Sequence, residues 1–232
     1  MPLHLAPLTT SDCLSWVRIR ALAYAGPTNL LVHNGQFPLS ESSILGVANE
    51  RKKEIGRPNC FHFKIVDTDL PPAPDDPQDN GGRTIAVASW IACNIELDRD
   101  GRRIEGSNEP IATTTQSPPF VPPELNTTIL AAILTPLQQG KEEIMGDRPY
   151  FMLITLSTHP EHQRRGAGSM LVKWGVDVAD RLHVEAYLST SIRGRLLYER
   201  FGFELVRGEE FDRTVWGGEG VDWHGHMMRR PR

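Results

Sequence analysis

The sequence predicts an α/β fold in which a mixed β-sheet lies between helices. In the C-terminal third, segments rich in apolar and β-branched residues alternate with segments of helical periodicity. In chain order these are strand 150–158, helix 168–182, strand 184–188, helix 191–201, strand 203–206 and strand 222–229. This order is typical of a sheet with helices packed on it. A length of 232 residues favours one domain, so we expect a single domain over 1–232.

The N-terminal part adds two helices and two strands. Apolar residues at helical spacing predict a helix over 9–24, which ends before Pro27, and a more exposed helix over 40–55. Residues 61–67 alternate like a strand. The nearly continuous run of apolar and small residues over 83–96 predicts a buried central strand. We therefore expect a helical layer and further strands before the C-terminal third.

Two loop insertions interrupt this pattern. Residues 70–82 are rich in proline and acidic side chains, which predicts a loop that stays mobile. Residues 97–149 form the longer insertion, and within it apolar spacing over 125–133 predicts a short helix. Pro136 should disrupt that helix, because proline lacks an N–H and clashes with the preceding turn.

Composition and charge exclude several classes of protein. The chain has 25 Lys and Arg against 29 Asp and Glu, a net charge of −4, so it lacks the basic signature of nucleic-acid binding. Hydrophobic residues make up 39% and charged residues 23%, which argues against a wholly disordered chain. No stretch of the sequence approaches the length of a membrane span, which needs about 18 consecutive apolar residues. We therefore expect neither nucleic acid nor a membrane as a partner of this protein.

Cysteine usage and the N-terminus indicate a reducing compartment. Cys13, Cys60 and Cys93 are an odd number without a CxxC pair, which argues against a disulfide framework and a thiolate zinc site. The first ten residues lack the basic and apolar regions of a signal peptide. A cytoplasmic location is therefore expected. His224-x-His226 has no third ligand at metal spacing, so it indicates a strand with alternating faces and no metal site.

The loop before helix 168–182 carries the first motif. It runs Gln163-Arg164-Arg165-Gly166-Ala167-Gly168. Its two glycines allow a tight turn, so that backbone N–H groups can point at one spot at the positive end of the helix. Such a nest can hold a pyrophosphate, with the two arginines adding charge at its rim. An ordinary strand–helix turn with solvated arginines is the alternative.

This loop is similar to the Q/R-x-x-G-x-G/A signature of the GNAT acyl-CoA N-acyltransferases, and it lies between a strand and a helix as in that family. A second motif follows thirty residues later, where Tyr198 precedes the Gly202-Phe203 turn. The resemblance covers residues 150–207, and the preceding helices and strands extend it over the chain. It implies a strongly bent mixed sheet that is split at a central strand pair, with helices on both faces.

The resemblance also implies a site for acetyl-CoA as cosubstrate. The end of strand 150–158 would pair with the pantetheine arm like an added strand, through Leu156, Ser157 and Thr158. The following loop would wrap the pyrophosphate, through Gln163, Arg164, Arg165, Gly166, Ala167, Gly168 and Ser169. Ser191 stands where many members have an asparagine that touches the cofactor. This departure puts its role in doubt, and Ser191 equally fits the N-cap of the last helix.

Two residues are the candidate catalytic groups. Tyr198 can donate the proton that the leaving CoA thiolate needs, although a core tyrosine would give the same pattern. Strand 150–158 holds no carboxylate or histidine in its interior, so Glu96 at the end of strand 83–96 is the nearest acid that could act as base. Weaker alternatives are His33, His62 and His159. A chain of water molecules is a further alternative.

The implied activity is transfer of an acetyl group from acetyl-CoA to a primary amine of a small molecule by direct attack in a ternary complex. The two insertions favour a small acceptor, and we expect residues 106–140 to border the acceptor side of the site. The alternatives are a protein or peptide acetyltransferase, acting on lysine or an N-terminus, and a non-catalytic acyl-CoA-binding module. A homodimer is left open. Trp90 could line the substrate pocket or fill the core, and the core is favoured.

Overall fold

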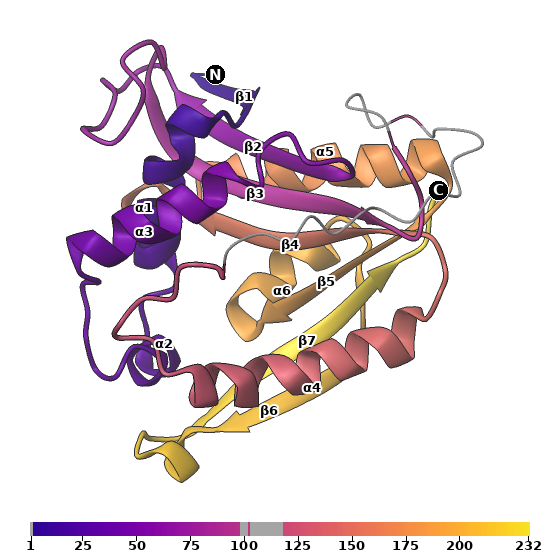
Figure 1. The fold of residues 1–232 in the computed structure, drawn as a ribbon. Coiled ribbons are helices and arrows are strands. Elements are labelled where there is room, and N and C mark those ends of the chain that lie inside the picture. The colour runs from indigo at the N-terminus through magenta and orange to yellow at the C-terminus, as the bar shows by residue number, and fades with distance from the viewer. Residues whose placement is uncertain (1, 98–101, 103–117) are drawn as a thin grey trace.

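The computed structural model describes residues 2–97, 102 and 118–232, whose strands form one mixed sheet (Figure 1). The strands are β1 (Leu3–Pro7), β2 (Cys60–Asp67), β3 (Arg83–Cys93), β4 (Tyr150–Thr158), β5 (Glu185–Ser191), β6 (Glu204–Asp212) and β7 (Val221–Arg229). Among these residues they pair in the order β1-β2-β3-β4-β5-β7-β6. The β4–β5 pair is parallel and the other pairs are antiparallel.

Helices cover both faces of this sheet, as the sequence predicts. They are α1 (Cys13–Ala23), α2 (Pro27–Val32), α3 (Glu41–Lys52), α4 (Thr127–Met145), α5 (Ala167–Leu182) and α6 (Ile192–Glu199). Helices α5 and α6 pack on one face, and α1, α3 and α4 lie over the other (Figure 1). Within the residues described, no helix combines the length and apolar character that a bilayer span needs.

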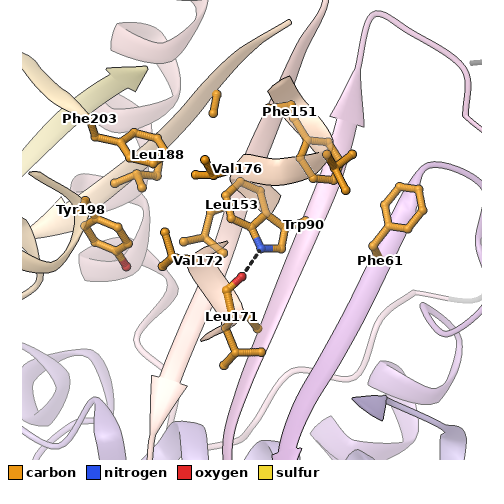
Figure 2. Packing of buried hydrophobic residues seen from close by; sticks show 14 of the residues in the cluster. Phe61, Trp90, Phe151, Leu153, Leu171, Val172, Val176, Leu188, Tyr198 and Phe203 are labelled. Carbon is orange, nitrogen blue, oxygen red and sulfur yellow. Dashed lines mark hydrogen bonds between the residues drawn. The ribbon is translucent and has the colours of Figure 1, made fainter. Parts of the chain in front are cut away.

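The alternation of side chains along β5 shows how the two faces are built. Ala186 and Leu188 belong to the core under α5 and α6, whereas Tyr187 packs with Met145 and Tyr150 on the opposite face. Trp90 is fully buried in the first of these cores. Its ring stacks on Phe151 with centroids 5.1 Å apart, and its Nε1 donates to the Leu171 carbonyl at 3.3 Å (Figure 2). Trp90 therefore fills the core, as the sequence predicts.

The sheet is split between β4 and β5. The two strands pair only over Tyr150–Leu153 and Glu185–Leu188. Beyond this point β4 stays paired with β3 through Thr158, and β5 stays paired with β7 through Ser191. Within the described part of the chain, one edge of β4 therefore has no neighbouring strand from Ile154 onward, which confirms the predicted split.

Helix α4 corrects one sequence prediction. The expected short helix ending near Pro136 is instead a helix of 19 residues that runs through Pro136. Its N-terminal half buries Ile129 with Val32 of α2 and Phe211 of β6, and its end buries Met145 beside Tyr150. Packing at both ends offsets the roughly 3 kcal/mol cost of an interior proline, a tertiary contribution that local periodicity does not contain.

Residues 70–82 also differ from expectation, because α1 holds them in place. Ser15 Oγ donates to the Asp75 carbonyl and to Asp76 Oδ1, both at 2.7 Å. Arg18 Nε forms an ion pair with Asp75 Oδ2 at 2.7 Å. The acidic residues of this segment, which predict a solvated loop, are thus the hydrogen-bond acceptors that anchor the loop to α1. Two elements not predicted, β1 and α2, complete the N-terminal part; Pro27 begins α2 instead of only ending α1.

An ion pair fastens the last strand to α5. Arg229 is 4% exposed, and its two terminal nitrogens each lie 2.7 Å from a carboxylate oxygen of Asp180. Its Nε donates to the Phe201 carbonyl at 2.8 Å. The hydrogen bonds from Arg229 hold the pKa of Asp180 below its ordinary value.

Asp180→Asn should lower the free energy of unfolding by about 1–3 kcal/mol at pH 7, because it leaves the buried Arg229 charge without a counterion. The folded pKa of Asp180 is lowered, so its stabilisation is complete above the unfolded carboxyl pKa and is lost as pH falls through the folded pKa. The difference between wild type and variant should therefore shrink below about pH 4. Urea denaturation measures both. Asp177→Asn, in the exposed pair with Lys173 on the same helix, is the control and should change stability by less than about 0.5 kcal/mol.

Candidate functional site

The free edge of β4 is the first part of the site. Leu156, Ser157 and Thr158 pair on one side with Ala88, Val87 and Ala86 of β3. Their other edge faces the split, where no β5 residue is paired with them. Backbone N–H and C=O groups on this edge are available to an extended ligand that pairs like an added strand. The segment predicted to bind the pantetheine arm thus lies on the edge of β4 that is not paired with β5.

The loop that follows β4 leads into an open helix N-terminus. Gln163, Arg164 and Gly166 are exposed. Gly166 has φ +92°, and a Cβ atom added there would meet none of the described residues within 4 Å, so they leave the space outside this turn open. The first N–H groups of α5, at Ala167, Gly168 and Ser169, have no acceptor within the helix. A helix of 16 residues with a bare N-terminus fits a pyrophosphate.

Gly168 joins this loop to the other parts of the site. A Cβ atom added at Gly168 would lie 3.3 Å from Leu197 Cδ2 of α6 and 3.6 Å from Leu156 Cδ2 of β4. The start of α5, the free edge of β4 and helix α6 therefore meet at one point. Tyr198 follows Leu197 directly, so the candidate acid lies on the same face of the sheet as the loop.

The two arginines of the loop differ in their surroundings. Arg165 forms an ion pair with Asp67 at the end of β2, with Nη2 and Oδ2 2.5 Å apart, and the Asp67 side chain is fully buried. Arg164 is exposed and has φ +66°. Both were expected as rim charges for the pyrophosphate. The ion pair gives Arg165 a structural contact in addition, whereas the salt bridges found among the described residues do not include Arg164, which is exposed.

Tyr198 is buried in α6, and its ring packs edge-on against Phe203 at 6.1 Å. Its hydroxyl points away from Phe203 and Leu188 (Figure 2). Burial raises the pKa of Tyr198 well above its ordinary value, so the phenol stays protonated near neutral pH. Among the described residues, burial and the nearby Tyr24 are the influences on this hydroxyl, and no hydrogen bond is among them. Tyr198 is thus both a core residue, as the alternative had it, and a phenol whose proton is uncommitted.

Ser191 occupies the N-cap position of α6, as the alternative prediction has it, but its side chain accepts no capping hydrogen bond. It is exposed and lies across from His224 of β7.

Glu96 is separated from the other site residues. It follows the end of β3 at Cys93, which pairs with Tyr150 at the start of β4. Leu156 lies six residues farther along β4, about 20 Å away. The antiparallel register therefore places Glu96 at the opposite end of the sheet from the free edge. Glu96 is a candidate because it lies at the end of a predicted strand. The sequence of that strand does not show which end of β4 lies beside Glu96.

The three candidate histidines lie on separate elements. His62 is buried in β2 with Nδ1 2.8 Å from Ser89 Oγ, and burial lowers its pKa. His159 Nδ1 accepts from the Glu161 backbone N–H at 3.3 Å in the loop after β4. His33 follows α2, with Nδ1 2.9 Å from the Asn29 carbonyl. Each ring already has a local partner.

Sequence reasoning missed a polar group on the other side of the split, formed by Tyr187 and Ser189 of β5 and by His226 of β7. The only signal was spacing. Tyr187 and Ser189 are two residues apart, as are His224 and His226, and in a strand such pairs share a face. His224-x-His226 does lie in a strand, as predicted, and β5 is its partner.

The fold and site together define the class of an acyl-CoA-dependent acyltransferase of the GNAT type, and comparisons with known proteins agree. Residues 89–203 match the profile of the Acetyltransferase (GNAT) family. A 44-residue stretch is 40% identical to the probable acyltransferase SID5 of Ajellomyces capsulatus, and this stretch spans 19% of the chain and 32% of that relative.

Solved structures are similar over nearly the whole chain. A histone acetyltransferase HPA2 and related acetyltransferase from Corynebacterium glutamicum has 17% identity and a TM-score of 0.55, over 100% of this chain and 98% of that one. A polyamine N-acetyltransferase of Drosophila melanogaster has 11% identity and a TM-score of 0.55, over 98% and 99%. At these identities the likeness concerns the fold. The chain therefore carries a GNAT acetyltransferase domain.

Gly166→Asp should weaken acetyl-CoA binding at least tenfold, because it places a carboxylate in the open turn where the pyrophosphate is expected. Gly56→Asp is the matched control. Gly56 also has a positive φ, +81°, with nothing within 4 Å of an added Cβ, so backbone strain and net charge change alike. Isothermal titration calorimetry measures the affinity. Equal affinities in the two variants would contradict the pyrophosphate site.

Arg164→Gln should weaken acetyl-CoA binding several-fold, more at low salt than at high salt, while stability is unchanged. Arg165→Gln should instead also lower the free energy of unfolding by about 1–2 kcal/mol, because buried Asp67 loses its partner. Calorimetry at two salt concentrations and urea denaturation separate the two effects. A stability loss in Arg164→Gln, with salt-independent binding, would assign Arg164 a structural role.

Proposed function

We propose that the protein transfers an acetyl group from acetyl-CoA to a primary amine of a small molecule, by direct attack in a ternary complex. One observation carries this proposal. At Gly168 the free edge of β4, the open N-terminus of α5 and the helix that bears Tyr198 come together. These parts supply, in order, a strand edge for the pantetheine arm, an anion site for the pyrophosphate and a proton donor for the departing sulfur.

The position of the cysteines supports direct attack over a covalent enzyme intermediate. Cys13 is buried in α1, and burial raises its pKa. Cys60 and Cys93 lie near the end of the sheet where β4 begins, away from its free edge, and burial raises the pKa of both thiols. A raised pKa makes these thiols poor nucleophiles. Cys60 and Cys93 also lie away from the free edge of β4, where the thioester is expected. The amine itself then forms the new C–N bond as the C–S bond breaks.

The packing of helix α4 against α2, beside the expected acceptor site, supports a small acceptor. Helix α4 packs against α2 through Ile129 and Val32. The Asn126 N–H donates to the Val32 carbonyl at 2.7 Å, which closes the segment before α4 onto α2. This part of the 106–140 segment lies on the face opposite α5, where the acceptor is expected; residues 106–117 lie outside the described residues. The three free cysteines support a reducing compartment such as the cytoplasm.

A protein or peptide acceptor is the alternative, since the similar solved structures include enzymes named for histones and for polyamines. A panel of small amines and of lysine and N-terminal peptides, assayed by release of the CoA thiol from acetyl-CoA, distinguishes the two. We expect turnover with small amines above that with peptides. Faster turnover of peptides would favour the alternative, and binding of acetyl-CoA without turnover of any acceptor would indicate a non-catalytic module.

Tyr198→Phe should lower kcat by roughly 10²-fold while acetyl-CoA affinity stays near wild type, because it removes only the proton donor for the leaving thiolate. Stability should change by less than about 1 kcal/mol, since no hydrogen bond from a described residue contributes to the environment of the hydroxyl. Steady-state kinetics and thermal unfolding measure the two effects. Unchanged kcat would mean that water protonates the thiolate and that Tyr198 serves packing alone.

A further inference from the structure

A chain of polar contacts begins at the split and is used by none of the roles assigned above. Ser189 is the first β5 residue after Leu188, the last that pairs with β4, and its side chain is exposed. Ser189 Oγ lies 3.3 Å from Tyr187 Oη. Tyr187 Oη lies 2.5 Å from His226 Nδ1 on the neighbouring strand β7. Three side chains thus connect the split to the interior on the face away from α5.

His226 is sealed in this interior. Its side chain has no exposed surface, and a Cβ atom added at Gly140 would lie 2.6 Å from both Cε1 and Nε2 of the ring. The backbone of α4 therefore lies directly on the imidazole, which explains a glycine inside this helix. The contact leaves Nδ1 facing Tyr187 and Nε2 facing β6.

The charged and titratable groups around His226 come from β6, β7 and α4. Glu209 Oε1 of β6 lies 3.5 Å from Nε2, and Arg207 Nε lies 2.5 Å from the same oxygen. Arg207 also pairs with Glu143 of α4, and His224 precedes His226 by two residues on β7. Burial lowers the pKa of His226, so the ring is neutral before the reaction. Glu209 is the group that compensates a positive charge on it.

Neutral His226 can carry its proton on either ring nitrogen. Glu209 Oε1 is 3.5 Å from Nε2, and among the described residues Nε2 has no hydrogen-bond partner. With the proton on Nε2, toward Glu209, Nδ1 is an acceptor, and only in this tautomer can Nδ1 receive a proton. Tyr187 Oη then donates to Nδ1 and accepts from Ser189 Oγ. The remaining lone pair of Ser189 Oγ is free for a donor in the split. Each hydroxyl donates once and accepts once, so the chain is oriented from the split toward His226.

We propose that Ser189, Tyr187 and His226 form a proton relay that removes a proton from the amine as it attacks the thioester. This inference rests on the proposed function. As the C–N bond forms, the amine nitrogen becomes acidic and gives a proton to Ser189 Oγ, whose own proton passes to Tyr187 Oη. The Tyr187 proton passes to His226 Nδ1, and Glu209 stabilises the imidazolium. The C–S bond breaks and the thiolate takes its proton from Tyr198, so the proton count balances.

In this relay Ser189 is the catalytic residue, because it touches the amine. Tyr187 and His226 are positioning residues that act through it. The relay supplies a base on the acceptor side of the split, a role that Glu96 is too distant to fill. It also places acid and base on opposite faces of the sheet, with Tyr198 on the α6 face and Ser189 on the α4 face.

The test compares Tyr187→Phe and Ser189→Ala with Tyr150→Phe. Tyr150 is a second buried tyrosine in the same cluster, with its ring edge-on to Tyr187 at 6.1 Å, and its hydroxyl bonds to Cys93 outside the relay. At saturating acetyl-CoA and amine, the two relay variants should lose about 100-fold in kcat. Their deficit should shrink as pH rises, because hydroxide replaces the relay, and the KM for acetyl-CoA should not change. Tyr150→Phe should stay within about twofold of wild type.

A second measurement needs no turnover. Nitrogen-15 NMR of the ligand-free protein, with His226→Gln for assignment, should show neutral His226 with its proton on Nε2. A proton on Nδ1 would overturn the relay, as would equal kcat and pH profiles in Tyr187→Phe and Tyr150→Phe while wild type turns over. Those two results leave the proposed function standing. A wild type that acetylates no amine overturns both.

Discussion

The whole site depends on one constraint, that β4 and β5 stop pairing after four residue pairs. Strand β4 keeps β3 on one side, and on the other side the backbone groups of its last five residues have no strand partner among the residues that the structure describes. Two of the side chains there, Thr155 and Ser157, have hydroxyl oxygens that are buried and unpartnered. Unsatisfied polar groups of this kind are rare in folded proteins, and two of the eight found among the described residues lie on the stretch where a ligand is expected.

The split also assigns different tasks to the two faces of the sheet. The α5 and α6 face holds the glycine loop and Tyr198, and its packing is tight enough that a Cβ atom added at Gly168 would contact both Leu156 and Leu197. The opposite face holds α4, which closes over His226 at Gly140. Because both faces reach the same gap, a thioester held from one side can be attacked from the other.

Much of the cofactor half was predictable from the sequence, since its parts are local. Strand 150–158, the glycine loop and the following helix adjoin one another along the chain, and the observed β4 and α5 match the predicted ranges closely. Local patterns failed where distant contacts decide. Helix α4 passes Pro136 because α2, β6 and Tyr150 bury its apolar side chains, and the acidic 70–82 segment is anchored because α1 presents Ser15 and Arg18 to it.

The sequence by itself determined the fold class, the glycine loop and Tyr198, because each depends on spacing within one short segment. Only the tertiary structure decided which groups share the acceptor side. Glu96 is excluded by the antiparallel register of β3 on β4, and Tyr187 meets His226 by the register of β5 on β7. Strand register is set by burial across the whole sheet, so the sequence of one strand does not reveal which residue of its neighbour lies opposite.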